Sequence, residues 1–368
     1  MEETTKPVWR GLMGVYFDRT SITEIQGNEG VLRHRGYSID QLALDPSYEK
    51  VAYLLIHGDW PDDEQARAFH AELAACRDLP PGVIDILRSM KDAPPHVALR
   101  TAVSSLGGHA GERYGQHRDW APIALLPSMV VVHEALRCGR PVPEPRPDLD
   151  LPSDFLSRLL GRSLSPFERY IINLDFVLHA DHGANASTFV ARVVTSTESD
   201  VHAALTAAIA AFAGRRHGGA IEGVAEMLDE LGTPEAARTF VKNYRPGDSE
   251  PIAGFGHRVY RVEDPRAKLF RKAVETLSDS LDDRHLLETL DALVVAMEPY
   301  RRFGLSPNVD LYAAVVYRLL GVPDDLPTTI FAVARSAGWI AQLQEQRANN
   351  ILIRPRLLYD GPGPRDLT

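Results

Sequence analysis

The chain has 368 residues, a formal net charge of −10 and a hydrophobic content of 44%. This length is sufficient for a large core and two lobes, and no apolar run is long enough to span a bilayer. The negative charge argues against nucleic acid as the main partner. The two cysteines, Cys76 and Cys138, form no disulfide framework, and residues 1–6 lack the features of a secretory signal. We therefore expect a cytoplasmic protein that acts away from membranes.

The predicted elements are mainly helical. Residues 11–37 favour short β pieces, because recurring glycines interrupt runs of Thr and Ile. Beyond residue 38 apolar residues recur at helical spacing, which predicts helices over 51–56, 66–75, 154–161, 167–180, 185–197, 200–213, 221–231, 264–280, 283–299, 309–320 and 327–347. Prolines at 140–152 and the Gly and Pro residues at 245–256 indicate loops. There is no βαβ alternation, so we predict an all-α architecture with minor β structure near the start.

Three short segments carry the chemistry that the sequence suggests. They are Arg216–Ala220 (RHGGA), Gly254–Tyr260 (GFGHRVY) and Pro307–Tyr312 (PNVDLY). Together they provide two imidazoles and one carboxylate. These groups can remove a proton from carbon and stabilise the enolate that forms.

Each of these residues also has a simpler interpretation. His217 precedes a predicted helix, where the helix dipole disfavours the cation, but a histidine in an ordinary Gly turn would look the same. His257 lies among glycines that allow a close approach of backbone to ligand, or that merely form a turn. Asp310 opens a predicted helix, where a carboxylate is favourable with or without a catalytic role.

Other polar residues are candidates for binding carboxylates. The spacing of His179 and His182 resembles a zinc motif, but no third ligand has convincing spacing, so we expect no metal. His182 is instead a candidate hydrogen-bond donor, whereas His179 is expected to be a structural helix residue. Arg335 lies in an apolar helix and needs a partner, which is either a substrate or a structural carboxylate. Arg354 stands before a proline near the C-terminus, as an exposed loop arginine would.

The order of these motifs along the chain is similar to that of the citrate synthase family. The resemblance extends from Gly11 to Tyr359. It includes 51–55 (VAYLL), 179–182 (HADH), 185–189 (NASTF) and 337–341 (AGWIA).

The resemblance implies a role for each candidate residue. Asp310 would take a proton from the methyl group of acetyl-CoA, His217 would bind the thioester oxygen, and His257 would polarise the oxaloacetate carbonyl. The remaining implied roles are carboxylate binding by His182, Arg266, Arg335 and Arg354, support of His217 by Ser187 and Asn185, and CoA binding by Arg258, Arg261, Gly254 and Gly256. No cofactor is implied, because coenzyme A enters as the thioester substrate. A homodimer is implied, in which Arg354 completes the site of the partner subunit.

The family fold implies a large domain (1–218 and 322–368) and a small domain (219–321) that closes over the site. The chain departs from the family pattern at Arg215-Arg216, Ile221, Gly183 and Ser306. The two arginines would disfavour protonation of the neighbouring His217 or reshape the acyl pocket. Two alternatives therefore stay open. One is a 2-methylcitrate synthase that uses propionyl-CoA, and the other is a non-catalytic paralogue that binds CoA or a dicarboxylate.

Overall fold

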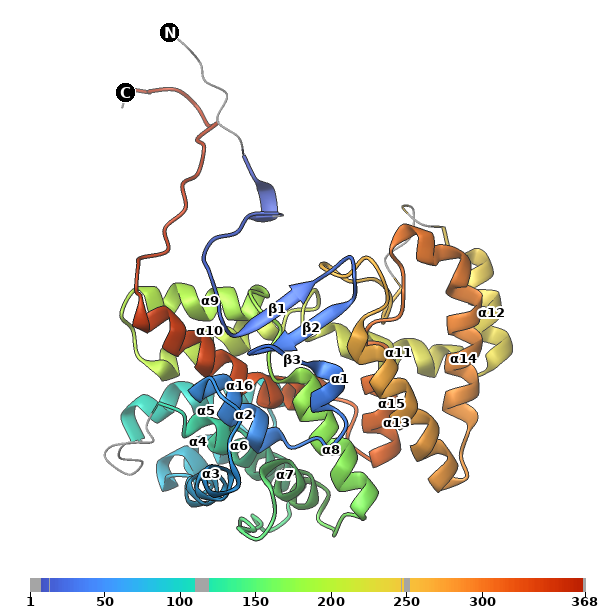
Figure 1. Cartoon of the computed structure of the whole chain (residues 1–368), viewed down its shortest axis with the longest axis horizontal. Helices are drawn as coiled ribbons and strands as arrows, with labels where there is room; N and C mark the ends of the chain where they lie inside the picture. The colour runs from blue at the N-terminus through green and yellow to red at the C-terminus, as the bar shows by residue number, and fades with distance from the viewer. Residues whose placement is uncertain (1–7, 13, 110–118, 246, 248–251, 367–368) are drawn as a thin grey trace.

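A computed structural model describes residues 8–12, 14–109, 119–245, 247 and 252–366. It confirms the predicted all-α class (Figure 1). The helices are η1 Arg10–Leu12, α1 Ile39–Leu42, α2 Tyr48–His57, α3 Asp63–Ala75, α4 Pro81–Ser89, α5 Pro95–His109, α6 Pro122–Arg137, α7 Leu151–Leu160, α8 Pro166–His179, α9 Ala186–Ser196, α10 Val201–Phe212, α11 Ala220–Leu231, α12 Pro234–Asn243, α13 Pro265–Leu281, α14 His285–Met297, η3 Glu298–Phe303, α15 Val309–Leu320 and α16 Pro327–Ala348.

A small antiparallel sheet near the start matches the predicted β element. Its strands are β1 Thr23–Gln26, β2 Val31–His34 and β3 Tyr37–Ser38, in the order β1-β2-β3. The β1–β2 turn packs on a distant loop, where the backbone N–H of Arg261 donates to the Gly27 carbonyl at 2.9 Å. A Cβ on Gly27 would lie 2.3 Å from the carbonyl oxygen of Val259, so this close approach requires glycine.

Some elements differ from the sequence prediction. Helix α7 begins at Leu151, inside the predicted Pro-rich loop, because Pro152 fits its first turn and the Asp150 side chain caps the Ser153 N–H. Helices α4, α5, α6 and α12 were not predicted. Helix α6 is buried on nearly all sides and contains Pro127, so it lacks the amphipathic period that marks a surface helix.

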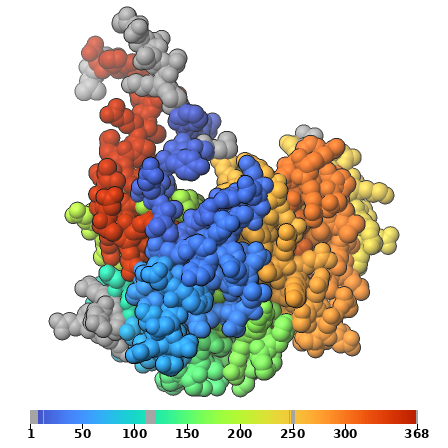
Figure 2. Space-filling model, viewed as in Figure 1, coloured from blue at the N-terminus to red at the C-terminus, as the bar shows by residue number. Residues whose placement is uncertain are grey.

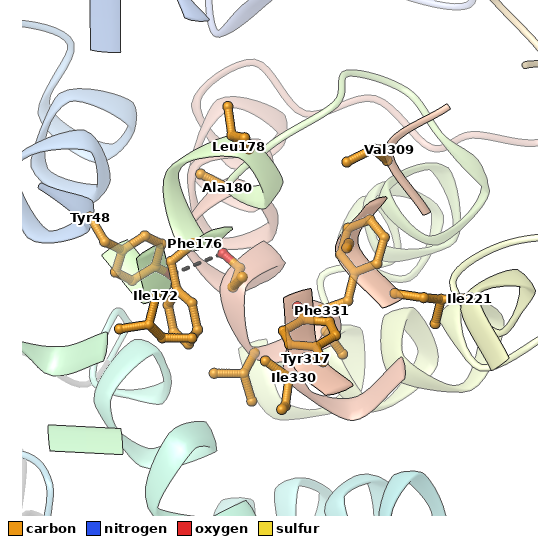
Figure 3. Packing of buried hydrophobic residues seen from close by; sticks show 14 of the residues in the cluster. Tyr48, Ile172, Phe176, Leu178, Ala180, Ile221, Val309, Tyr317, Ile330 and Phe331 are labelled. Carbon is orange, nitrogen blue, oxygen red and sulfur yellow. Dashed lines mark hydrogen bonds between the residues drawn. The ribbon is translucent and has the colours of Figure 1, made fainter. Parts of the chain in front are cut away.

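Helix α16 forms the centre of the core. It is buried from Pro327 to Leu343 and packs against α2, α6, α8, α9 and α10. Figure 3 shows the aromatic and aliphatic side chains that gather here, including Tyr48, whose hydroxyl donates to the Ala334 carbonyl at 3.0 Å. At Gly338 this helix contacts the C-terminal end of α8, where the Gly338 N–H donates to the Ala180 carbonyl at 3.0 Å.

Helices α11 to α15 lie together on one side of the molecule (Figure 1). Helix α13 packs on α15, α12 on α14 and α11 on α15, while α11 also contacts α16 and α13 contacts α8. These helices fall within residues 219–321, the range predicted for the small domain, and the boundary itself stays a prediction.

The described residues near both ends of the chain, from 8 onward and up to 366, extend away from the body of the molecule (Figure 2). The residues after α16 form neither helix nor strand as far as 366. Among the described helices, none is long and apolar enough to cross a membrane.

We predict that Gly338→Ala destabilises the protein by about 1–3 kcal/mol through overpacking. The added Cβ would lie 2.2 Å from the Ala180 carbonyl oxygen and 2.6 Å from Asp181 Cβ. The control is Gly223→Ala in α11, whose new Cβ would meet only ordinary contacts, the nearest at 3.7 Å. The urea concentration at the midpoint of unfolding should decrease for Gly338→Ala and stay at the wild-type value for Gly223→Ala. Equal midpoints for both would contradict the close packing.

Candidate active site

The loop with His257 is tied to the start of α15, which carries Asp310. The backbone N–H of Gly256 donates to the Ser306 carbonyl at 2.8 Å, and the N–H of Asn308 donates to the Gly254 carbonyl at 2.9 Å. Gly254 and Gly256 have φ angles of 78° and 82°, which favour glycine. Two of the three predicted segments therefore meet through backbone hydrogen bonds.

The imidazole of His257 is fixed in one tautomer. Its Nδ1 accepts hydrogen bonds from the backbone N–H groups of Val259 at 3.0 Å and Tyr260 at 3.1 Å. The proton of the neutral ring is therefore on Nε2. Burial, and then the charge of Arg266, lower the pKa of His257 to about 4. At neutral pH this residue is an uncharged hydrogen-bond donor.

His182 lies beside His257, with ring centroids 5.2 Å apart. Its Nε2 is 3.1 Å from the hydroxyl of Tyr260, and both side chains are buried. Burial, followed by the charge of Arg266, holds the pKa of His182 well below its usual value. Sequence reasoning missed Tyr260 as a site residue, although it stands three positions after His257 and contacts both histidines.

His217 is held by the N-terminus of α9. Its Nε2 lies 2.9 Å from Ser187 Oγ and accepts from the Ser187 backbone N–H at 3.3 Å. The same atom is 3.1 Å from Asn185 Oδ1, an oxygen that already accepts from the backbone N–H groups of Ser187 and Thr188. The Ser187 hydroxyl donates to the same Oδ1 at 2.7 Å, so Nε2 is surrounded by two oxygens and one N–H group. We predict the tautomer with the proton on Nδ1, in which Nε2 accepts from the Ser187 N–H.

The environment of His217 keeps it neutral. Burial, and then Arg335, lower its pKa to about 4. Arg215 and Arg216, which the sequence suggested as the cause, are exposed. The Trp339 indole N–H donates to Ser187 Oγ at 3.2 Å. Trp339 therefore supports His217 through Ser187, a contact between segments 152 residues apart that sequence spacing does not reveal.

Two buried arginines differ in how they are paired. Arg266 forms a bidentate pair with Asp264, at 3.0 Å from Nε and 2.7 Å from Nη2. Burial alone would lower the pKa of Arg266, but Asp264 outweighs it and raises the pKa. Arg335 donates from Nε to the His179 carbonyl at 2.5 Å, and no carboxylate among the described residues forms an ion pair with it. Burial lowers the pKa of Arg335 to about 10, so it remains a cation available to an anionic ligand.

Asp310 lies in the first turn of α15, where the Asn308 side chain caps its backbone N–H at 3.0 Å. Within the part of the chain that the structure describes, no group donates a hydrogen bond to its carboxylate. Burial raises the pKa of Asp310 to about 7, with Asp264 adding to the rise and Arg266 and Arg335 opposing it. A carboxylate with this pKa can act as a general base near neutral pH.

The remaining predicted arginines lie at the protein surface. Arg258 and Arg261 are exposed on the loop that follows His257. Arg354 is exposed on the C-terminal segment, and the single chain does not bring it to the other candidates. Gly183, one of the departures from the family pattern, has a φ of 54°, a left-handed conformation that glycine adopts without strain.

Comparison with known proteins identifies the family. The family model described as "Citrate synthase, C-terminal domain" matches residues 11–356. The chain belongs to the citrate synthase family. It is 40% identical to a citrate synthase of Haloferax volcanii, over 98% of this chain and 97% of that protein. It is 34% identical to 2-methylcitrate synthase 2 of Corynebacterium glutamicum, over 99% of this chain and 97% of that protein.

Solved structures agree with this assignment. The citrate synthase of Pyrobaculum aerophilum superimposes with a TM-score of 0.92 at 33% identity, covering 100% of this chain and 96% of that chain. The citrate synthase of Thermoplasma acidophilum, solved as a ternary complex with carboxymethyl coenzyme A and oxaloacetate, gives a TM-score of 0.91 at 29% identity. It covers 99% of this chain and 99% of that chain.

The raised pKa of Asp310 predicts an effect of Asp310→Asn on stability. In the unfolded chain an aspartate loses its proton near pH 4, whereas in the folded protein Asp310 keeps it until about pH 7. The wild-type protein therefore loses stability as pH rises through this range, and the neutral asparagine does not. The free energy of unfolding of Asp310→Asn, relative to wild type, should increase between pH 4 and 8.

The control for this prediction is Asp63→Asn, which changes an exposed aspartate in the first turn of α3. Urea unfolding at pH 4, 6 and 8 measures both variants. A constant difference between Asp310→Asn and wild type would show that the pKa of Asp310 is not raised in the folded protein.

Proposed function

We propose that this protein condenses acetyl-CoA with oxaloacetate to give citrate and CoA. The observation that carries the proposal is the combination of Asp310, whose pKa is about 7, and two imidazoles that are neutral because the pKa of each is about 4. Removal of a proton from the methyl group of acetyl-CoA needs a base that is deprotonated near neutral pH and hydrogen-bond donors that stabilise the enolate oxygen.

In the first step, Asp310 takes a proton from the methyl carbon of acetyl-CoA. The electrons of the C–H bond move into the enolate, whose negative charge lies on the thioester oxygen. His217 donates a hydrogen bond from Nδ1 to this oxygen. The pKa of His217 is about 4, so its ring is uncharged at neutral pH. The ring therefore stabilises the enolate oxygen as a neutral hydrogen-bond donor.

In the second step, the enolate carbon attacks the ketone carbon of oxaloacetate. His257 donates from Nε2 to the ketone oxygen and supplies this proton as the oxygen becomes the hydroxyl of the product. Solvent then returns a proton to the His257 ring, and Asp310 releases the methyl proton to solvent, which restores both groups. Hydrolysis of the citryl thioester then releases citrate and CoA. Closure of the predicted small domain over the site would exclude water until the carbon–carbon bond has formed.

Oxaloacetate brings two carboxylates, and the buried cations provide the matching charge. Within the described ranges, the Nη groups of Arg335 and the Nη1 of Arg266 have no hydrogen-bond partner, and His182 adds a neutral donor. The exposed guanidinium groups of Arg258 and Arg261, together with the backbone of Gly254 and Gly256, would bind CoA. The Thermoplasma relative named above was solved with a CoA derivative and oxaloacetate, which supports these substrates.

A homodimer would complete the site. The C-terminal segment carries exposed apolar side chains that a second copy would cover, namely Ile351, Leu352, Leu357, Leu358 and Tyr359. Because this segment stands away from its own body, Arg354 is free to reach the partner's oxaloacetate site (Figure 2).

A second candidate is condensation of propionyl-CoA to 2-methylcitrate. The 34% identity to the Corynebacterium 2-methylcitrate synthase supports this second candidate. An additional methyl group changes binding in a hydrophobic pocket by only about 1–3 kcal/mol, so the two activities can overlap. A binding protein for CoA or a dicarboxylate, without turnover, is the third outcome that an activity measurement must distinguish.

Oxaloacetate-dependent release of free CoA thiol tests the proposal, with acetyl-CoA and propionyl-CoA compared side by side. We expect faster turnover with acetyl-CoA. We also expect Asp310→Ala to lower kcat by roughly 100- to 10,000-fold, because the base is removed. Asp63→Ala, at an exposed position in α3, is the control and should keep wild-type turnover. Faster turnover with propionyl-CoA would favour 2-methylcitrate synthase activity. Absence of turnover with both thioesters would contradict the proposal that the protein is an enzyme.

The pKa values predict the pH dependence of kcat/KM. Asp310 must be deprotonated to act, so the rate should rise with pH and level off above about pH 7. His217 and His257 stay neutral down to about pH 4 and should add no second limb between pH 5 and 8. A rate that falls as pH increases from 6 to 8 would mean that a histidine cation, rather than a neutral imidazole, takes part.

A further inference from the structure

A buried carboxylate outside the proposed site joins two of the elements that form it. Asp175 on α8 is fully buried. The hydroxyl of Tyr317 donates to it, at 2.9 Å from Oδ1 and 2.8 Å from Oδ2. The Nδ1 of His179, one turn later on α8, lies 2.9 Å from Oδ1. Neither Asp175 nor Tyr317 was a candidate residue in the sequence.

Tyr317 connects this carboxylate to the proposed base. It lies on α15, seven residues after Asp310, so the two side chains project from the same face two turns apart. Helix α15 belongs to the range predicted for the small domain, and α8 belongs to the large one. The hydrogen bond from Tyr317 to Asp175 therefore holds the helix of the base to the opposite domain.

His179 connects the same carboxylate to the proposed oxaloacetate site. Its backbone carbonyl accepts from Arg335 Nε at 2.5 Å, and its ring lies 3.7 Å from that of Phe331 on α16, centroid to centroid. The guanidinium of Arg335 lies 5.2 Å from the Phe331 ring. In Figure 3, Tyr317 and Phe331 belong to the same buried cluster.

Asp175 depends on hydrogen bonds rather than on an ion pair. Burial lowers the pKa of His179 despite the nearby Asp175, so the ring is neutral and donates from Nδ1. Its Nε2 is buried and has no hydrogen-bond partner among the described residues. No arginine or lysine forms an ion pair with Asp175 in the same part of the chain. A buried carboxylate with two donors is sensitive to the loss of either.

We propose that Asp175, His179 and Tyr317 form a positioning relay that fixes Asp310 relative to Arg335. The relay consists of three successive links: Tyr317 to Asp175, Asp175 to His179, and His179 to Arg335. It rests on the proposed function, in which Asp310 takes the methyl proton and Arg335 binds oxaloacetate. The separation of these two residues sets where the enolate carbon meets the ketone. None of the three residues needs to touch a substrate.

The test is Tyr317→Phe, which removes only the hydroxyl. We expect kcat for citrate formation to fall by roughly 10- to 100-fold, because a base displaced by about 1 Å removes the proton more slowly. The deuterium isotope effect on kcat, measured with methyl-deuterated acetyl-CoA, should increase, since proton removal becomes slower than the other steps. The Kd of oxaloacetate should change less than threefold, because His179 still holds Arg335.

The isotope effect separates positioning from a structural role. A variant that merely contains less folded protein would show lower activity with an unchanged isotope effect. The matched control is Tyr312→Phe, which removes a hydroxyl from another buried tyrosine of α15 that has no hydrogen-bond partner among the described residues. This control should retain the wild-type kcat and isotope effect.

A second variant keeps the proposal testable if Tyr317→Phe does not fold. Asp175→Asn retains an oxygen that accepts from Tyr317 but replaces the other carboxylate oxygen with an NH2 group, which disturbs the hydrogen bond with His179. This variant should also lower kcat and increase the isotope effect. Wild-type kcat and isotope effect in the folded variant would overturn the relay while leaving the proposed function intact. Absence of oxaloacetate-dependent CoA release from the wild-type protein would overturn the proposed function itself.

Discussion

The site depends on the burial of Arg335, which has no ion-pair partner among the described residues. A buried guanidinium is costly unless an anion reaches it, and in this part of the chain its hydrogen bond goes to a carbonyl oxygen. Its charge lowers the pKa of His217, and it limits the rise in the pKa of Asp310 that burial causes. One desolvated cation thus influences the proposed hydrogen-bond donor, the proposed base and the proposed binding of oxaloacetate.

Helix N-termini place most of the other groups. Ser187, Arg266 and Asp310 lie in the first turns of α9, α13 and α15, and His217 lies just before α11. Side chains of Asn185, Asp264 and Asn308 cap three of these helices. Helix N-termini favour anions and disfavour an imidazolium, so the same architecture suits an anionic substrate and neutral histidines. Caps also fix the first turn, which gives these side chains defined positions.

The sequence predicted those features that depend on local pattern. The helical class, the β element near residue 23 and the start of α15 at Asn308 follow from periodicity, glycines and capping residues. The roles proposed for His217, His257 and Asp310 rest on the order of motifs along the whole chain, because each residue alone also fits an ordinary turn or helix start. Helix α6 was missed because it is apolar on nearly every face.

Features that depend on distant contacts were not predictable from the sequence. The hydrogen bond from Trp339 to Ser187 and that from Tyr317 to Asp175 join residues 152 and 142 positions apart. The pKa of Asp310 results from burial by several elements, and no motif encodes it. The pairing of Arg266 with Asp264, and the absence of an ion pair for Arg335 among the described residues, likewise appear only in the folded chain.

Burial holds His217 and His257 neutral, and we propose that they carry their protons on different nitrogens. The most direct measurement is the nitrogen NMR spectrum of the protein labelled with ¹⁵N-histidine, recorded from pH 5 to 8 and assigned with His217→Gln and His257→Gln. We predict a neutral ring protonated at Nδ1 for His217 and at Nε2 for His257, without titration across this range. Titration of either ring near pH 6.5, or protonation at the same nitrogen in both, would contradict it.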